Sequence, residues 1–266
     1  MAESNSGYKV LSKNKIKLIR SLDQKKNRTA TGLFVAEGKK LIFDLLQSDV
    51  AVSEIFCLKI LADEVNNRHS GLKIEIVDKE DLSRISFLKT APEIIALFFI
   101  PKSEIDWNEI KNGLTLVLDS VQDPGNLGTI VRLADWFGIR NIICSEEVVD
   151  LFNPKVVQST MGALGRVKVH YVSLPGFFDH VKWLDIPVYG TYLEGENIYN
   201  CHLTSTGIIF FGNEGSGISD AAAIYISKRI TIPSYPQGAV TSESLNVAIA
   251  ASIICSEFRR QTNCKV

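Results

Sequence analysis

From Leu114 onward, short apolar runs alternate with segments of helical pattern, and this alternation limits the possible folds more than any other feature of the chain. The apolar runs lie near 114–118, 141–144, 167–172, 188–191, 207–211 and 229–232. Helical patterns are expected between them, near 127–137, 154–164, 176–184 and 219–226, with a last long helix over 243–260. Strands that are separated by helices form a mostly parallel sheet covered on both faces. We therefore predict an α/β domain over 112–266.

The first hundred residues show the same alternation with shorter elements. Helical patterns near 12–24, 38–47, 60–68 and 79–87 alternate with apolar runs at 33–35, 52–58, 73–77 and 93–100. Ser12 is expected to cap the first of these helices. Pro101 ends the region, and the polar stretch 102–113 is typical of a linker or a short connecting helix. We predict a small N-terminal α/β domain over 1–104.

Composition excludes several classes of protein. At 266 residues with 45% hydrophobic residues, the chain can bury one large core or two ordinary ones. Its longest apolar runs, 94–100 and 247–255, are far shorter than the roughly 20 residues of a membrane helix. The N-terminus has no apolar core of the signal-peptide kind. We expect a soluble cytoplasmic protein that does not enter a membrane.

Cysteine usage does not indicate a disulfide framework or a metal site. The five cysteines are Cys57, Cys144, Cys201, Cys255 and Cys264, an odd number without a C-x-x-C pair. Adjacent Cys201 and His202 are poor candidates for one ion, because neighbours in sequence rarely point at the same ligand position. We expect no metal and mostly inert, buried thiols.

Charge is distributed unevenly along the chain. The net charge is −1, yet residues 9–40 hold ten basic side chains against two acidic ones, a local balance of +8. A basic face on a mildly acidic body is typical of a phosphate-binding surface, although a solvated lysine-rich helix is an equally good interpretation of charge alone. Lys13, Lys17 and Arg20 are the candidate contacts on the first helix.

The stretch QDPGNLGTIVR, residues 122–132, is the first of three loops that follow apolar runs. Its Pro-Gly pair makes a tight turn, Asn126 can cap the next helix, and Gly128 offers a bare backbone. Arg132 then falls among apolar residues of that helix. An arginine on the solvent face whose stem covers apolar surface is the ordinary explanation.

The second loop is FFGNEGSGIS, residues 210–219, in which Gly212, Gly215 and Gly217 surround the single charge of Glu214. It lacks both the dinucleotide fingerprint and the lysine of a triphosphate site. A simple glycine-rich turn is the alternative to a binding site.

The third loop runs from Ile232 and Pro233 to the last helix, whose first turn is expected to hold Ser244, Leu245 and Asn246. Those polar residues are explained equally well as helix caps. All three loops, however, follow parallel strands at their carboxyl ends, where open α/β sheets place their crevices. We expect the loops to converge.

At these residues the sequence resembles the SpoU (TrmH-type) family of RNA ribose methyltransferases within the SPOUT class. The family's first motif is similar to Asn126, Gly128 and Arg132, and its second to Gly212–Gly215. Its third resembles Ile232 and Pro233 followed by Ser244–Val247. The loop 234–243 is a few residues longer than is usual in the family, which bears on the choice of substrate.

The resemblance implies a deep trefoil knot in the C-terminal domain, S-adenosylmethionine as cofactor and an obligate homodimer. Main-chain groups would hold the cofactor at Thr191, Gly212, Asn213, Ile232, Pro233 and Leu245. The N-terminal segment around 34–38, with Arg28 and Lys39, resembles the ribosomal-protein-like RNA-binding domain of many members. The substrate implied is RNA, with ribosomal RNA favoured because the minimal transfer-RNA enzymes lack that domain.

The resemblance also assigns roles in methyl transfer to a ribose 2′-hydroxyl. Arg132 faces the reacting oxygen, and a guanidinium, being a poor base, would stabilise the developing alkoxide. Asn126 would orient the ribose or Arg132, and Glu214 would hold Arg132 or the substrate. Ser244 and Asn246 would fix the third loop and bind the nucleotide. The alternatives are a transfer-RNA 2′-O-methyltransferase, a non-catalytic RNA-binding protein on this fold, and a nucleotide-dependent oxidoreductase, against which the missing dinucleotide fingerprint argues.

Overall fold

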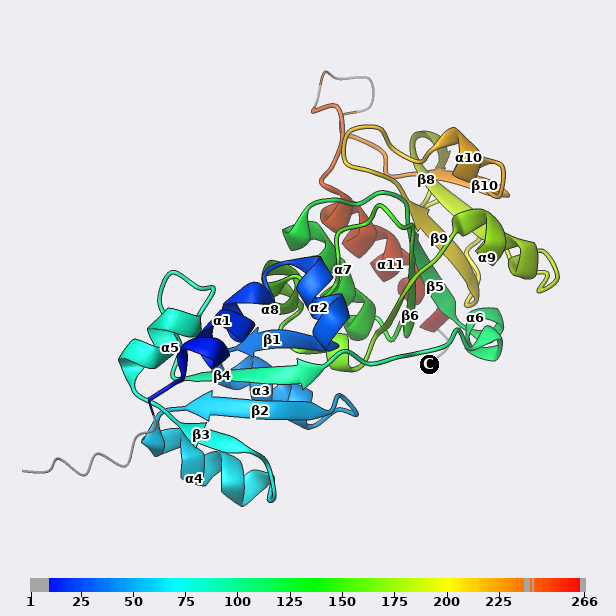
Figure 1. Ribbon diagram of the computed structural model, residues 1–266. Helices are drawn as coiled ribbons and strands as arrows, with labels where there is room; N and C mark the ends of the chain where they lie inside the picture. The colour runs from blue at the N-terminus through cyan, green and yellow to red at the C-terminus, as the bar shows by residue number, and fades with distance from the viewer. Residues whose placement is uncertain (1–9, 237–239, 241, 264–266) are drawn as a thin grey trace, which may run out of the picture. The chain divides into compact units, whose positions relative to one another are not determined.

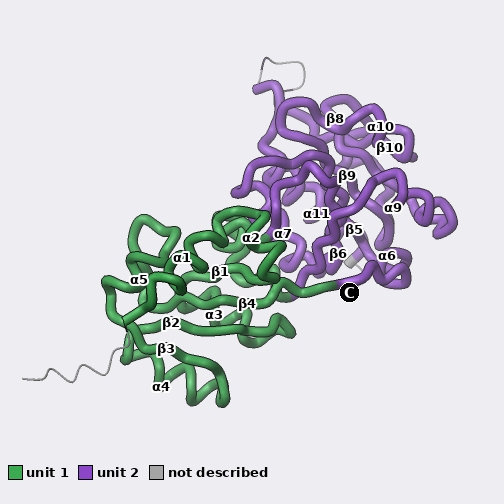
Figure 2. The backbone as a smooth tube through the Cα atoms, in the orientation of Figure 1, with its two compact units in different colours: residues 1–102, 152–165 green, residues 103–151, 166–266 purple. Residues whose placement is uncertain are grey.

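The computed structural model describes residues 10–236, 240 and 242–263, which form two compact units (Figures 1 and 2). Unit 1 comprises residues 1–102 and 152–165, and unit 2 comprises 103–151 and 166–266. Within the described part of the chain, no helix is both long enough and apolar enough to span a membrane.

Unit 1 is built on a mixed four-stranded sheet in the order β1-β4-β2-β3. The strands are β1 (Leu33–Glu37), β2 (Val52–Cys57), β3 (Ile74–Ile76) and β4 (Ile94–Phe99). β4 pairs antiparallel with β1 and β2, whereas β2 and β3 are parallel. Its helices are α1 (Lys13–Ser21), α2 (Lys25–Thr31), α3 (Lys39–Leu46), α4 (Lys59–Arg68), α5 (Lys79–Ile85) and α8 (Pro154–Thr160), with the 3₁₀ turn η1 (Ala163–Gly165).

Helix α1 is amphipathic, and its N-terminus is fixed as predicted. Ser12 Oγ accepts a hydrogen bond from the Lys15 amide at 3.2 Å, which satisfies one of the free donors of the first turn. Ile19 and Leu22 are buried in a core shared with the inner face of the sheet. The opposite face of α1 therefore keeps its lysines in solvent.

Unit 2 contains a six-stranded sheet in the order β10-β8-β9-β5-β6-β7, and every neighbouring pair is parallel. The strands are β5 (Leu114–Leu118), β6 (Asn141–Cys144), β7 (Lys168–Tyr171), β8 (Val188–Asn197), β9 (Gly207–Phe211) and β10 (Lys228–Thr231). The helices are α6 (Trp107–Asn112), α7 (Pro124–Trp136), α9 (Leu174–Val181), α10 (Asp220–Ala223) and α11 (Val247–Asn263). The predicted parallel sheet is confirmed.

Helices cover both faces of this sheet, because successive strand residues point to opposite sides. Val117, Ile208 and Phe210 pack against apolar residues of α6 and α9 on one face. On the other face, Tyr189 of β8 meets Phe258 of α11 with ring centroids 5.0 Å apart, and α11 packs against α7.

Two helices begin at other residues than expected, α7 earlier and α11 later. Asp123 caps α7 by accepting from the Asn126 amide at 2.8 Å, with Pro124 in the first turn. The expected cap at Asn126 is therefore wrong, and Asn126 lies within the helix. Similarly, α11 begins at Val247, because Asn246 Oδ1 accepts from the amides of Ala248 and Ile249 at 2.9 and 3.2 Å. Gly138, with φ 63°, ends α7 as predicted.

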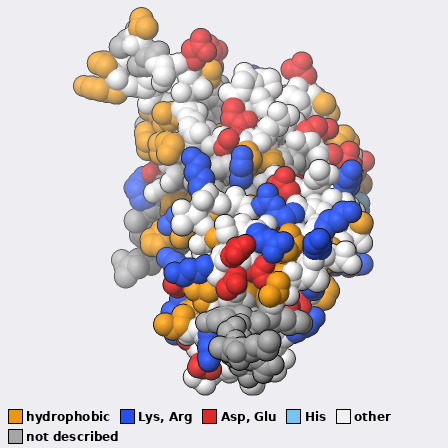
Figure 3. All heavy atoms as spheres, turned by 60° about the vertical axis from the view of Figure 1, so that its left-hand side comes forward, with side chains coloured by type: hydrophobic (Ala, Val, Ile, Leu, Met, Phe, Trp, Pro, Cys, Tyr) orange, Lys and Arg blue, Asp and Glu red, His pale blue; other side chains and the backbone are white. Residues whose placement is uncertain are grey.

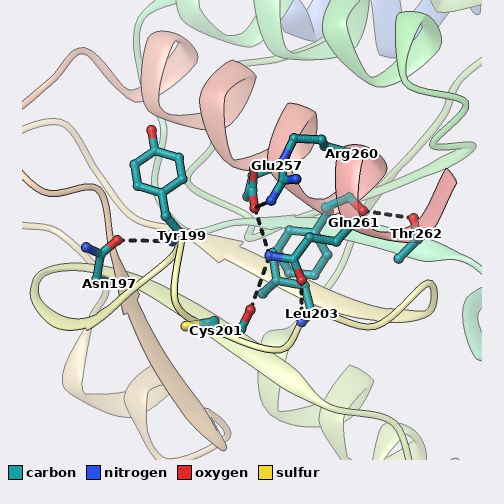
Figure 4. A network of polar contacts seen from close by, with 9 residues as sticks. Asn197, Tyr199, Cys201, Leu203, Glu257, Arg260, Gln261 and Thr262 are labelled. Atoms are coloured by element: carbon teal, nitrogen blue, oxygen red, sulfur yellow. Dashed lines mark hydrogen bonds and ion pairs between the residues drawn. The ribbon is translucent and has the colours of Figure 1, made fainter. Parts of the chain in front are cut away.

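Hydrogen bonds join the C-terminal end of α11 to the segment that follows β8 (Figure 4). Gln261 donates from Nε2 to the Cys201 carbonyl at 3.1 Å and accepts from the Leu203 amide at 3.1 Å. The same Nε2 donates to Glu257, which forms an ion pair with Arg260 at 2.6 Å. The hydrogen bond from Arg260 lowers the pKa of the buried Glu257 carboxyl.

Candidate active site

Three strands, β5, β9 and β10, deliver the three predicted loops to one edge of the unit 2 sheet, and β8 lies between β9 and β10. Residues 119–126 follow β5, 212–219 follow β9, and 232–246 follow β10. β8 contributes Thr191, where its pairing with β10 shifts from Gly190 to Glu196. The carboxyl ends of parallel strands are where such sheets bind ligands.

A chain of side-chain hydrogen bonds joins the three loops through Asn126. Its Nδ2 donates to Glu214 Oε1 at 2.8 Å, and its Oδ1 accepts from Asn246 Nδ2 at 2.8 Å. These partners lie 88 and 120 residues from Asn126 in sequence. Asn126 itself is 9% exposed. The expected convergence of the three loops is therefore present, and Asn126 stands at its centre.

Two glycines of the second loop stand where a residue with a side chain is disfavoured. A Cβ on Gly212 would lie 2.1 Å from the backbone carbon of Gly217, because the chain closes on itself there. The amide and carbonyl of Asn213 pair with the carbonyl and amide of Gly217 at 2.9 and 3.0 Å. Gly217 has φ 72°, a conformation that favours glycine. The loop is thus a tight, internally bonded turn that projects Glu214.

Several supporting residues were missed by sequence reasoning. Asp119, 4% exposed, accepts from the Ser219 amide at 2.9 Å and so joins the end of β5 to the second loop. Asn213 was expected only near the cofactor, yet its Nδ2 also donates to the Ser120 carbonyl at 2.7 Å. Ser120 has φ 58°, a strained value at a site edge. The sequence does contain a signal for the start of α7: an Asp followed by a Pro, as at 123–124, is typical of a helix cap and first turn.

Arg132 lies on the solvent-exposed side of α7. Trp136, one turn further on, is 85% exposed. Among the described residues, the Arg132 guanidinium has no hydrogen-bond or ion-pair partner. Glu214 binds Asn126 rather than Arg132, so within one chain Arg132 and the loop network are not linked directly.

The remaining residues expected at the site lie along the same edge. Thr191 Oγ1 donates to the Phe210 carbonyl at 2.9 Å, which places it beside the strand that leads into Gly212. Ile232 is half-buried, Pro233 and Ser244 are exposed, and Leu245 is 47% exposed. Residues 237–239 and 241 of the long third loop lie outside the described residues.

The expected RNA contacts in unit 1 separate into two groups. Lys13, Lys17 and Arg20 are exposed on one side of α1, at spacings of four and three residues. Arg28 is 2% exposed, and its guanidinium donates to the Leu22 and Asp23 carbonyls, so it holds the turn between α1 and α2. Lys and Arg side chains gather on the face drawn in Figure 3.

Lys39 is exposed but already engaged, because its Nζ lies 2.7 Å from Glu64. The described thiols are buried and free. Burial raises the pKa of Cys57 to about 11 and of Cys255 to about 12, so neither is a ready nucleophile. In the ranges that the structure describes, no group of His, Cys, Asp and Glu is arranged to hold a metal ion.

Comparison with known proteins agrees with this geometry. Residues 113–256 match the SpoU rRNA Methylase family, and residues 13–96 match the MRM3-like substrate binding domain. The chain is 30% identical over 249 residues to the 23S rRNA (guanosine(2553)-2'-O)-methyltransferase RlmP of Bacillus subtilis, covering 92% of this chain and 96% of that protein.

Two solved structures share the fold over almost the whole chain. A protein assigned to the TrmH family of RNA methyltransferases from Porphyromonas gingivalis superposes with a TM-score of 0.84 at 39% identity, covering 95% of this chain and 100% of that one. The AdoMet-bound rRNA methyltransferase from Sinorhizobium meliloti gives a TM-score of 0.82 at 28% identity, covering 94% and 97%. Fold and site thus define an α/β methyltransferase. The chain belongs to the SpoU rRNA methylase family, and the resemblance seen in its motifs is confirmed.

Proposed function

We propose that the edge of the sheet around Asn126 transfers a methyl group from S-adenosylmethionine to the 2′-hydroxyl of a ribosomal RNA nucleotide. Family membership carries the reaction class. The observation that carries the location is the Asn246–Asn126–Glu214 chain, because it unites all three family motifs at one point. Unit 1 would bind the RNA and unit 2 would catalyse. The division expected from sequence, 1–104 and 112–266, assigns residues 152–165 to the catalytic domain, whereas they belong to unit 1.

The residues at this edge fit S-adenosylmethionine. No lysine or arginine occurs in 210–219 or 232–246, so these loops lack the cations that bind a triphosphate. Apolar Ile232 and Leu245, with main-chain groups at Thr191, Gly212, Asn213 and Pro233, suit an uncharged adenosine. The carboxylate of Glu214 suits a cationic sulfonium. When bound, the cofactor supplies an electrophilic methyl group.

The protein's own contribution is orientation and charge. Arg132 would stabilise negative charge that develops on the ribose oxygen, while the proton leaves to water or a phosphate. A guanidinium keeps its proton and does not serve as the base. Asn126, held between Glu214 and Asn246, fixes the loops and the start of α7, which carries Arg132 two turns further on. Ser244, exposed beside this network, would bind the nucleotide.

The exposed side of α7 supports a homodimer. Gly125, Thr129, Arg132 and Trp136 form one exposed stripe of the helix, and the neighbouring α11 exposes Ile249, 52% accessible. Large apolar side chains that are exposed on a helix face are found at interfaces. A second copy of the chain on this face would cover Trp136 and bring Arg132 against a cofactor site, which a single chain does not do.

The trefoil knot remains part of the proposal. It rests on membership of the SpoU family. A cytoplasmic location is proposed with the ribosomal substrate.

The activity is tested by incubating the purified protein with ribosomal RNA and methyl-deuterated S-adenosylmethionine, followed by mass spectrometry of the digested nucleosides. We expect label in a 2′-O-methyl nucleoside and none with Arg132→Ala. Label on a base would contradict the reaction. Label in transfer RNA but not ribosomal RNA would favour the alternative substrate, and RNA binding without any transfer would favour the non-catalytic alternative.

A further inference from the structure

Unit 1 contains a cavity of about 250 Å³ that the proposed reaction does not use. It lies between β1, the chain after α5, and α8, which packs against β1. The residues that define its chemistry are Glu37, Phe87, Leu88, Pro154, Lys155 and Gln158. The cavity thus combines a buried acid, an aromatic ring, apolar walls and polar groups, the usual composition of a small-molecule pocket.

Glu37 provides the acid and is 4% exposed. Its carboxylate accepts from the Phe87 amide at 2.7 Å and from the Ser86 hydroxyl. Burial raises the pKa of the Glu37 carboxyl, and these hydrogen bonds oppose the rise. A carboxylate has about four acceptor positions, so two contacts leave it able to accept more N–H donors. A phosphate, which is itself anionic, is a poor occupant beside it.

The walls suit a flat ring. The Phe87 ring lines the cavity. The Arg20 guanidinium, which is not a lining group, lies 4.8 Å from the centroid of that ring. Leu88 and Pro154 add apolar surface. Aromatic and guanidinium planes are the groups on which proteins stack unpaired RNA bases.

The polar groups from α8 suit the edge of a base. Gln158 is half-buried, and among the described residues its side-chain amide has no hydrogen-bond partner, so it can both donate and accept. Lys155 is exposed at the same cavity and can meet a phosphate. One side chain therefore reads an edge while the other binds the backbone.

The basic side of α1 leads to this cavity. Lys13, Lys17 and Arg20 share one side of the helix, and Arg20 contacts both the Ser86 carbonyl and the Phe87 ring. A strand of RNA whose phosphates follow α1 would pass the cavity mouth. Because the carboxylate favours paired N–H donors, guanine fits best: its N1–H and N2–H groups face Glu37, and its O6 and N7 acceptors match the Gln158 amide.

We propose that the cavity lined by Glu37, Phe87 and Gln158 binds one unstacked guanine of the RNA, separate from the nucleotide that is methylated. The inference rests on the proposed function only in taking RNA as the partner. It makes unit 1 a reader of sequence as well as a phosphate-binding surface.

The test is fluorescence anisotropy, without cofactor, on a labelled oligouridine that carries one central guanosine, compared with the same oligomer carrying adenosine or only uridine. We expect the parent protein to bind the guanosine oligomer about tenfold more tightly. Gln158→Ala, at a half-buried position, and Glu37→Gln should each remove this preference. Lys155→Ala should weaken binding to all three oligomers equally.

Arg132→Ala should keep the guanosine preference, which separates this pocket from the proposed catalytic site. A parent protein without preference, or a Gln158→Ala variant with the preference intact, would overturn the proposal. A preference that is lost in Arg132→Ala but kept in Gln158→Ala would also overturn it, because guanine would then be read in unit 2. Methyl transfer decides the proposed function independently of all these outcomes.

Discussion

Replacing Asn126 with alanine removes the centre of the hydrogen-bond chain that joins the three loops, while α7 remains capped by Asp123. The change deletes one hydrogen bond to the Glu214 carboxylate and one from the Asn246 amide, both 2.8 Å long. A bond to a charged group contributes about 1.5–3 kcal/mol and a neutral one about 0.5–1.5 kcal/mol. Both partners are exposed and regain water, so we expect a net loss of about 1–2 kcal/mol in the free energy of unfolding.

That loss corresponds to a fall in Tm of about 2–8 °C, measured by calorimetry. Methyl transfer should fall much further, by about 100-fold or more, because the three loops are no longer held in register. Asn112→Ala is the matched control, since Asn112 is an exposed asparagine whose side chain bonds to Asn108 one turn away. Parent-like transfer by Asn126→Ala, at any Tm, would refute the idea that this chain of hydrogen bonds organises the site.

Four further predictions follow from the same structure. Arg132→Ala should abolish methyl transfer while leaving S-adenosylmethionine affinity, measured by calorimetry, within about twofold, because the guanidinium acts on the ribose oxygen; lost cofactor affinity would argue against this role. Changing Lys13 and Lys17 to Glu should weaken RNA binding and reduce the slope of log affinity against log salt concentration by about one per lost phosphate contact. The same change at Lys59 and Lys111, exposed on other helices, should leave the slope as it is. An unchanged slope in the Lys13 and Lys17 variant would show that the RNA binds to another surface. Gly212→Ala should lower the free energy of unfolding by about 2–4 kcal/mol, because the new Cβ would lie 2.1 Å from the Gly217 backbone carbon. Gly215→Ala is the control and should be tolerated, because its Cβ would lie 3.6 Å from Asn213 Oδ1. Equal Tm values for the two variants would show that the loop is not tight. The pKa of the Glu257 carboxyl is lowered in the folded state, so the ionised carboxylate stabilises the fold at pH values above 4.5, its usual pKa, and this stabilisation is lost as the pH falls through the lower folded pKa. The difference in Tm between the parent protein and Glu257→Gln should therefore become smaller from pH 7 to pH 3. A difference in Tm that stays constant would exclude the ion pair as the source of the stabilisation.

Much of the architecture could be predicted from sequence because it depends on local pattern. Apolar runs such as 114–118 and 207–211 became strands at the expected positions. Helix starts were less predictable, because Asn126 and Asp123 are both good caps and only the three-dimensional partners decide between them. Once Asp123 caps α7, the Asn126 side chain is free to reach Glu214.

Residue roles that depend on distant contacts could not be read from the chain. Arg28 belongs to a strongly basic segment, yet the turn between α1 and α2 buries it against the Leu22 and Asp23 carbonyls. The Asn126–Asn246 bond spans 120 residues, and no periodicity encodes it. The order of the motifs pointed to three loops that do meet at one edge of the sheet, but only the folded sheet shows which side chain joins them.

The most direct test of the account is a crystal structure with S-adenosylmethionine bound. We predict that the cofactor contacts backbone at Gly212, Ile232 and Leu245, and that Arg132 of the same chain or of a dimer partner points at its methyl group. Cofactor bound away from these loops, or Arg132 facing bulk water in every copy, would contradict the account.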